Sequence, residues 1–213
     1  MSDELLFYHN PFSRGRIVQW MLEEVGAPYR VELVRLDQRE QKRPEYLAVN
    51  PMGKIPTIVH RGVVITEAAA ICTYLADAFP ETKLAPALTD PARGTYLRWL
   101  FFGAGCIEPA LADKLLERPA PAPERSSALG YGSYENVLAT LEKAVSPGPH
   151  ILGDAFSAAD VYVGSAIGFG LGSKAIEPRP AFMSYLAKLS ERPAYKRANA
   201  KNEAFAAELK AKS

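Results

Sequence analysis

Hydrophobic and polar positions follow two different periods in the first 33 residues of the chain. Residues 5–9 (LLFYH) form a short apolar run, which predicts a buried strand. In residues 14–25 the apolar side chains recur at helical spacing, and Gly26 predicts where that helix ends. Apolar and polar residues then alternate over 29–33. This alternation predicts a second strand, parallel to the first because a helix connects the two.

The pattern continues with strands and then a helix up to residue 79. A short helix is expected within 38–48, followed by two strands in IPTIVHRGVVI that turn at Arg61-Gly62. The Ala-rich segment 66–79 is strongly helical. Residues 1–79 are therefore predicted to form one α/β domain with the order βαβ, then ββα.

Beyond a linker predicted at 80–90, almost every segment has a helical pattern. One helix is expected from Asp90-Pro91 to about residue 117, and a second up to Val145. The segment 156–171 is apolar on all sides and begins with Ser157 and Asp160 at the spacing of a capping box. It is expected in the middle of an all-helical domain covering 91–213, whose last residues (AAELKAKS) are expected to fray.

Composition narrows the classes of function. The chain has 213 residues, 48% of them hydrophobic, and a formal net charge of +1, which gives no electrostatic basis for binding nucleic acid or an anionic membrane. No apolar run reaches the roughly 18 residues of a membrane span. The acidic N-terminus is unlike a signal peptide, so a cytoplasmic protein is expected. Two cysteines and three scattered histidines predict no metal site.

Three segments, in this order, resemble motifs of the glutathione transferases. They are VNPMGKIPTIV (49–59), ITEAAAICTYL (65–75) and FSAADV (156–161). The resemblance implies a thioredoxin-like N-terminal domain with a mixed four-stranded sheet, followed by an all-α C-terminal domain. It also implies glutathione as co-substrate, a small electrophilic substrate and a homodimer.

Pro56 stands within residues that otherwise favour a strand, although proline donates no backbone hydrogen bond. The resemblance implies that the Ile55–Pro56 bond is cis and that the Ile55 backbone is left open to pair with the cysteinyl part of glutathione. The alternative is an ordinary trans proline on an edge strand. Lys54 and, more speculatively, Gln41 are placed to bind the glycyl carboxylate, or are simply exposed polar side chains.

Glu67 and Ala68 match the family positions that meet the γ-glutamyl group of glutathione. Without the flanking motif, Glu67 would be interpreted as a solvated acid in the first turn of a helix. Ala68 stands where the family usually has serine, so one hydroxyl donor is missing. Its loss should cost about 1.5–3 kcal/mol of binding if nothing replaces it. Weaker glutathione binding is therefore expected.

Ser13 lies between the first strand and the first helix and resembles the catalytic serine or cysteine of the bacterial and theta-like classes. No cysteine is nearby, so the thiol must come from the ligand and the protein contributes an O–H donor. Ser13 also suits a helix N-cap, and Asn10 is the second candidate for the donor. Phe12, Phe102 and Cys106 are candidates for the electrophile pocket, although core packing is the more common explanation for an aromatic residue such as Phe102 on the 91–117 helix.

Together these observations predict a glutathione transferase that activates the glutathione thiol as a thiolate for attack on a small hydrophobic electrophile. Two alternatives stay open. A glutathione-dependent isomerase or peroxidase would use the same site with a different pocket. A non-catalytic binding or regulatory module is the alternative that Ala68 favours.

Overall fold

A computed structural model describes residues 4–211 of the chain, except for the side chains of Pro123 and Ser126. The chain forms two compact units, one built from residues 1–82 and 192–213 and the other from 83–191. No helix among the described residues is long and apolar enough to cross a membrane.

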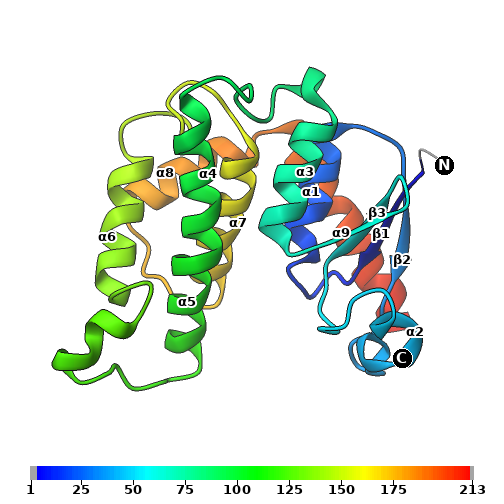
Figure 1. The fold of residues 1–213 in the computed structure, drawn as a ribbon, viewed down its shortest axis with the longest axis horizontal. Helices are drawn as coiled ribbons and strands as arrows, with labels where there is room; N and C mark the ends of the chain where they lie inside the picture. Colours follow the sequence, from blue (N-terminus) through cyan, green and yellow to red (C-terminus); the bar gives the residue numbers. More distant parts are fainter. Residues whose placement is uncertain (1–3, 212–213) are drawn as a thin grey trace. The chain divides into compact units, whose positions relative to one another are not determined.

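The first unit is built on a mixed four-stranded sheet with the order β2-β1-β3-β4 (Figure 1). β1 (Leu5–His9) is parallel to β2 (Tyr29–Leu33), and β3 (Thr57–His60) is antiparallel to both β1 and β4 (Val63–Thr66). In this register the ends of β1, β2 and β4 and the start of β3 meet at one edge of the sheet, here called the site edge. The predicted mixed sheet is confirmed.

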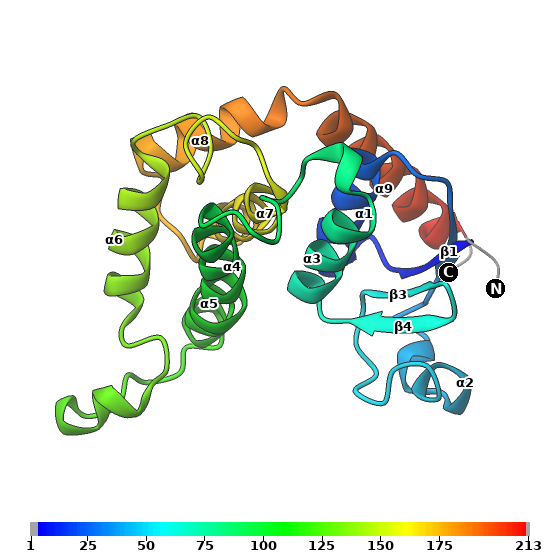
Figure 2. The same ribbon diagram turned by 45° about the horizontal axis from the view of Figure 1, so that its top comes forward.

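Helices cover both faces of this sheet (Figure 2). α1 (Gly15–Val25), α3 (Ala68–Ala78) and α9 (Pro193–Ala211) lie on one face, and α2 (Pro44–Leu47) lies on the other. The alternation along β1 explains this arrangement, because every second side chain of the strand is buried. A short 3₁₀ helix, η1 (Glu40–Lys42), precedes α2, and another, η2 (Pro80–Thr82), follows α3.

The second unit is entirely helical. It contains α4 (Ala92–Phe102), the π-helix η3 (Gly103–Ile107), α5 (Glu108–Leu115), the 3₁₀ helix η4 (Pro123–Ala128), α6 (Tyr134–Val145), α7 (Ala158–Gly172) and α8 (Pro180–Ser190). α7 is buried over most of its length up to Ile167, as its apolar sequence predicts, whereas Phe169 near its end is 39% exposed. The expected capping box is present, and the buried Asp160 carboxylate also accepts hydrogen bonds from the Ile151 N–H at 2.7 Å and the Tyr185 hydroxyl at 2.8 Å.

Two helices of the second unit differ from the prediction. The single helix expected from Asp90-Pro91 to residue 117 is interrupted by η3, where Gly103 lies so close to Tyr162 that a Cβ atom would stand 2.5 Å from its ring. An extra residue in the turn is one way in which a helix adjusts to such a contact. The helix before Val145 begins only at Tyr134, where Ser133 caps it by accepting a hydrogen bond from the Asn136 N–H.

The C-terminal segment also differs from the prediction. The expectation of a frayed end is wrong up to residue 211, because α9 continues to Ala211 and Leu209 is buried. Lys212 and Ser213 lie outside the described residues. α9 packs against α1 in the first unit, where the aromatic rings of Trp20 and Tyr195 meet edge to face at 4.9 Å. The compact units thus divide the chain differently from the predicted boundaries of 1–79 and 91–213.

Candidate active site

The turn between β1 and α1 holds Ser13 at the site edge. Its hydroxyl donates to the Asn10 carbonyl at 2.7 Å and accepts from the Gly15 N–H at 2.9 Å. Ser13 is half-buried and stands one residue before the Arg14 N-cap of α1. A side-chain oxygen at the start of a helix satisfies a backbone donor there. Ser13 therefore contributes to the helix start, and its O–H lies near the positive end of the α1 dipole.

Asn10, the second candidate for the donor, supports the turn instead. It is buried, its side-chain amide donates to the Val34 carbonyl at 2.8 Å, and its Oδ1 accepts from the Phe12 N–H at 2.9 Å. The first bond ties the β1–α1 turn to the segment that follows β2, and the second holds the turn itself. Ser13 is more accessible than Asn10, so the geometry favours Ser13 as the donor.

A buried histidine lies directly behind this turn. The Nε2 atom of His9 is 2.9 Å from the Asn202 Oδ1, and the Asn202 amide donates to the Ala198 carbonyl. The amide oxygen is thus an acceptor, so Nε2 carries the proton and Nδ1 is bare. A Cβ on Gly15 would stand 2.5 Å from Nδ1 and 3.0 Å from the Ser13 Oγ. Only glycine fits there without displacing one of these atoms.

The loop that enters β3 places the Ile55 backbone at the same edge. The Ile55–Pro56 peptide bond is cis. Within residues 4–211, the N–H and C=O of Ile55 make no hydrogen bond. The preceding Lys54 carbonyl accepts from the Tyr46 hydroxyl at 2.6 Å and from the Asn50 amide at 2.9 Å. The loop is therefore held from one side, and the polar backbone groups of Ile55 stay unpaired within residues 4–211.

Tyr46 and Asn50 are supporting residues that the sequence reasoning missed. Both also contact the Thr57 hydroxyl, at 2.9 and 3.2 Å, so they connect the loop to the first residue of β3. Asn50 lies in the quoted segment VNPMGKIPTIV, and a polar residue inside a matched motif was the available signal. Tyr46 carried no signal, because its partner is known only once α2 is folded onto the sheet.

Glu67 stands at the end of β4 with an unusual backbone conformation. Its φ is +63° and its ψ is 116°, which is costly for a residue with a Cβ, at about 1–3 kcal/mol. Its carboxylate is exposed and makes no ion pair or hydrogen bond with another residue of the 4–211 range. Ala68 follows as the first residue of α3, where backbone N–H groups have no partner within the helix.

Two further predicted residues lie near this edge of the first unit. Gln41, in η1, carries an Oε1 atom that is buried and lacks a hydrogen-bond partner among the described residues. Lys54 is exposed, and the neighbouring Lys42 ammonium donates to the Met52 carbonyl at 2.9 Å. Of these two lysines, Lys54 has the ammonium group that makes no hydrogen bond or ion pair with another described residue, so it is the one available for an anionic ligand.

The three predicted pocket residues belong to different compact units. Phe12 is 63% exposed beside Ser13 in the first unit. In the second unit, Phe102 packs edge to face on Trp99 with ring centroids 5.5 Å apart, and Cys106 lies half-buried in η3. Burial raises the pKa of the Cys106 thiol. A pocket shared by the three residues stays a prediction.

Comparisons with known proteins match this architecture. The model of the glutathione S-transferase N-terminal domain matches residues 11–78. Glutathione S-transferase F10 of Arabidopsis thaliana is 30% identical over 92% of this chain and 97% of its own length. This chain belongs to the glutathione S-transferase family. A sphingomonad glutathione S-transferase solved in complex with glutathione is 31% identical, has a TM-score of 0.76, and aligns with 93% of this chain and 98% of that chain.

An isomerase is also among the relatives of this glutathione S-transferase family member. Maleylacetoacetate isomerase maiA of Aspergillus fumigatus is 28% identical over 82% of this chain and 80% of its own length. Family membership thus leaves the particular reaction open. The thioredoxin-like fold and the helical unit are common to the matched structures, and the site residues must be argued from their own chemistry.

Proposed function

We propose that this chain binds glutathione at the site edge and activates its thiol for attack on a small hydrophobic electrophile. One observation carries the proposal: the unpaired N–H and C=O of Ile55 lie at the sheet edge that also holds Ser13 and Glu67. An extended peptide can pair with such a free backbone edge as an added strand does. The glutathione complex of the sphingomonad relative supports this ligand.

Each part of glutathione has a matching group in the proposed complex. The Glu67 carboxylate pairs with the γ-glutamyl ammonium, and the N–H groups at Ala68 and the start of α3 bind its carboxylate. Ile55 pairs with the cysteinyl backbone, alongside Pro56. Lys54, with the amide of Gln41, binds the glycyl carboxylate. The thiol then lies near Ser13.

The chemical task is to hold the sulfur as a thiolate at neutral pH. A free thiol has a pKa of about 8.5, and lowering it by about 2 units requires about 2.7 kcal/mol of preference for the charged form. The Ser13 O–H and the N-terminus of α1 together supply interactions of that size. Ser13 must turn its proton from the Asn10 backbone carbonyl towards the sulfur, and the thiol proton leaves to solvent water. The thiolate then forms a bond to the electrophilic carbon while the bond from that carbon to its leaving group breaks, or while a π bond of the electrophile opens and takes up a proton.

Substitution of Ser13 tests this role. In Ser13→Ala, the pKa of bound glutathione, followed by thiolate absorbance, should rise by about 1–2 units because a charge-assisted hydrogen bond is lost. Turnover at neutral pH should fall with it. Ser184→Ala is the matched control, because Ser184 is exposed on α8 and its hydroxyl makes no hydrogen bond with another residue of the described range. An unchanged thiol pKa in Ser13→Ala would remove Ser13 from the mechanism.

A second substitution separates catalysis from the binding-module alternative. Ala68→Ser restores the hydroxyl that the family usually has, so glutathione should bind about tenfold more tightly or better. A chain that shows no glutathione binding at millimolar concentration, with or without this change, would be a non-catalytic module.

Because one relative is an isomerase, activity should be assayed with an isomerisable substrate as well as in transfer reactions. A homodimer and a cytoplasmic location are also proposed, on family resemblance alone.

A further inference from the structure

A second cavity lies in the first unit at the opposite end of α1 from Ser13. Its volume is 640 Å³, within the 300–1,000 Å³ typical of small-molecule sites. It is lined by the last turn of α1, the segment from Gly26 to Val31, and one side of α9. α1 is 11 residues long, so this cavity lies about 15 Å along the helix from the proposed thiol site. Glutathione at the site edge would leave it empty.

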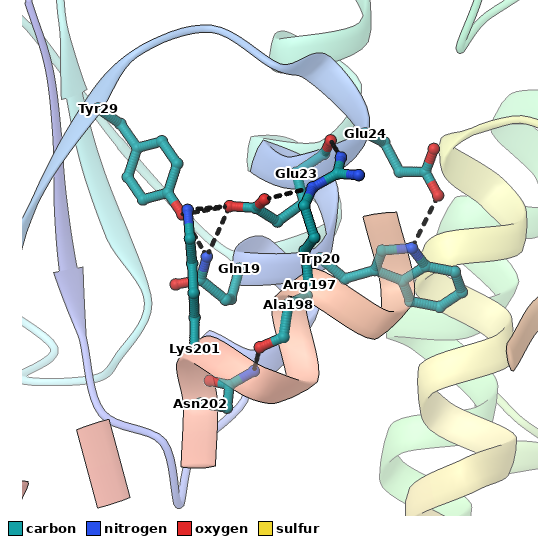
Figure 3. Close-up of polar contacts among 9 residues, drawn as sticks. All are labelled: Gln19, Trp20, Glu23, Glu24, Tyr29, Arg197, Ala198, Lys201 and Asn202. Carbon is teal, nitrogen blue, oxygen red and sulfur yellow. Dashed lines mark hydrogen bonds and ion pairs between the residues drawn. The ribbon is translucent and has the colours of Figure 1, made fainter. Parts of the chain in front are cut away.

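A charged network borders this cavity (Figure 3). The buried Glu23 carboxylate of α1 accepts hydrogen bonds from Lys201 at 2.5 Å and Arg197 at 3.0 Å, both on α9. It also accepts from the Tyr29 hydroxyl at 2.6 Å and from the Gln19 amide at 3.4 Å. Burial alone would raise the pKa of Glu23, but the bonds from Lys201, Tyr29 and Arg197 outweigh it and lower that pKa. Glu23 is therefore ionised and fully supplied with donors.

The network has more cationic donors than its carboxylate can use. Arg197 donates through Nε to the Glu23 carboxylate and through Nη2 to the Glu23 backbone carbonyl, and within residues 4–211 its Nη1 makes no hydrogen bond. Lys201 uses two of its three N–H groups, on Glu23 and on the Tyr29 hydroxyl at 3.0 Å. The side chains of Arg197 and Lys201 are 53% and 47% exposed. Two cations against one carboxylate leave one positive charge at the cavity.

The neighbouring carboxylate, that of Glu24, differs from Glu23 in the number of cations that it meets. Glu24 faces the bidentate guanidinium of Arg192, with both distances 2.7 Å, and the Trp20 indole N–H at 2.9 Å. One arginine pairs with one carboxylate there, whereas Glu23 meets two cations.

Apolar groups form the rest of the cavity wall. Leu22, Pro28, Val31, Ala204 and Phe205 line it. Such a surface next to a surplus positive charge is complementary to a ligand that carries an anionic head and an apolar tail. A carboxylate fits the guanidinium geometry of Arg197 particularly well, because arginine binds carboxylates through two parallel hydrogen bonds.

We infer that the cavity between α1, β2 and α9 binds small carboxylates with an aromatic or aliphatic tail. The carboxylate contacts Arg197 and Lys201, and the tail lies against Leu22, Val31 and Phe205. This site is independent of the proposed glutathione chemistry, since it shares no residue with the site edge.

Three probes separate the contribution of the anionic carboxylate to binding from that of the apolar tail. They are 4-phenylbutanoate, its neutral amide, and acetate. Amide shifts of the ¹⁵N-labelled protein should move in residues 22–31 and 197–205 with 4-phenylbutanoate. The neutral amide and acetate should each bind at least about tenfold more weakly. The amide lacks the negative charge, and acetate lacks the apolar tail. Movement of other residues only, or equal binding of the neutral amide, would overturn the inference.

Variants test the cation directly. Lys201→Gln should weaken 4-phenylbutanoate binding about fivefold or more, and Lys201→Arg should retain it. Lys210→Gln is the matched control, because Lys210 is exposed on the same helix and does not line the cavity. Thermal unfolding checks that each variant is folded. Unchanged affinity in folded Lys201→Gln would contradict the inference, whether or not glutathione binds elsewhere.

Discussion

Acidification should destabilise the first unit through His9. This side chain is fully buried at the end of β1, packed between the rings of Phe7 at 4.8 Å and Phe205 at 5.5 Å, and bonded to Asn202 of α9. Burial lowers the pKa of His9 from 6.5 to about 4. The hydrogen bond with Asn202 opposes this shift only in part. The folded chain therefore keeps a neutral imidazole where the unfolded chain would be protonated.

The sign and size of the effect follow from proton linkage. Between pH 6.5 and 4 the unfolded chain binds a proton at His9 that the folded chain does not, so lowering the pH favours unfolding. A difference of about 2.5 pKa units corresponds to about 3 kcal/mol over the whole range, of which about 2 kcal/mol is lost by pH 4.5. Stability attributable to His9 is complete above pH 6.5 and declines below it.

Urea unfolding at several pH values between about 7 and 4.5 measures this loss. The control is His9→Gln, which keeps an amide donor for Asn202 but cannot be protonated. Other groups titrate in the same range, including the buried Asp160, whose pKa burial raises. Their contributions cancel in the difference between the wild type and the variant. The wild-type free energy of unfolding should fall by about 2 kcal/mol more than that of His9→Gln.

Parallel curves for the two proteins would refute this reasoning. If His9→Gln does not fold, the His9 ring protons can be followed by NMR in the wild type instead. They should show no titration above about pH 5. A midpoint near the ordinary value of 6.5 would mean that the imidazole is hydrated and charged in the folded chain.

Two further predictions concern packing in the second unit. Gly103→Ala should lower the free energy of unfolding by about 1–3 kcal/mol, because the new methyl group meets the Tyr162 ring. Gly105→Ala is the control, because there is open space around Gly105. Equal free energies of unfolding for the two variants in urea would contradict this. Asp160→Ala should lower the free energy of unfolding by about 3 kcal/mol or more, because buried N–H groups, including that of Ile151, lose their acceptor. A decrease of less than about 1 kcal/mol in urea unfolding would contradict this prediction.

Much of the sheet and of the site edge could be predicted from the sequence, because both depend on local patterns. A short apolar run predicted β1, alternation predicted β2, the Arg61-Gly62 turn predicted β3 and β4, and the connections predicted their directions. Once that topology is set, Ser13, Ile55 and Glu67 must meet at one edge. Their meeting is a consequence of strand order and needs no side-chain detail.

The features that sequence reasoning missed depend on contacts between distant segments. α9 buries only Ala194, Ala198, Asn202 and Leu209, a narrow stripe of mostly small or polar residues that gives little hydrophobic signal. The π-helix depends on where the Tyr162 ring falls against Gly103. The positive φ of Glu67 likewise becomes visible only when β4 and α3 are both in place.

The return of the final helix to the opening strand has a consequence for biosynthesis. During translation, the unit that carries Ser13 lacks Arg192 and Asn202 until residues 83–191 have been made. The helical unit lies between the two segments of the first unit and is therefore complete earlier. Nascent chains should therefore gain protease resistance in the middle before they gain it at the start, in contrast to the usual order in which N-terminal domains fold first.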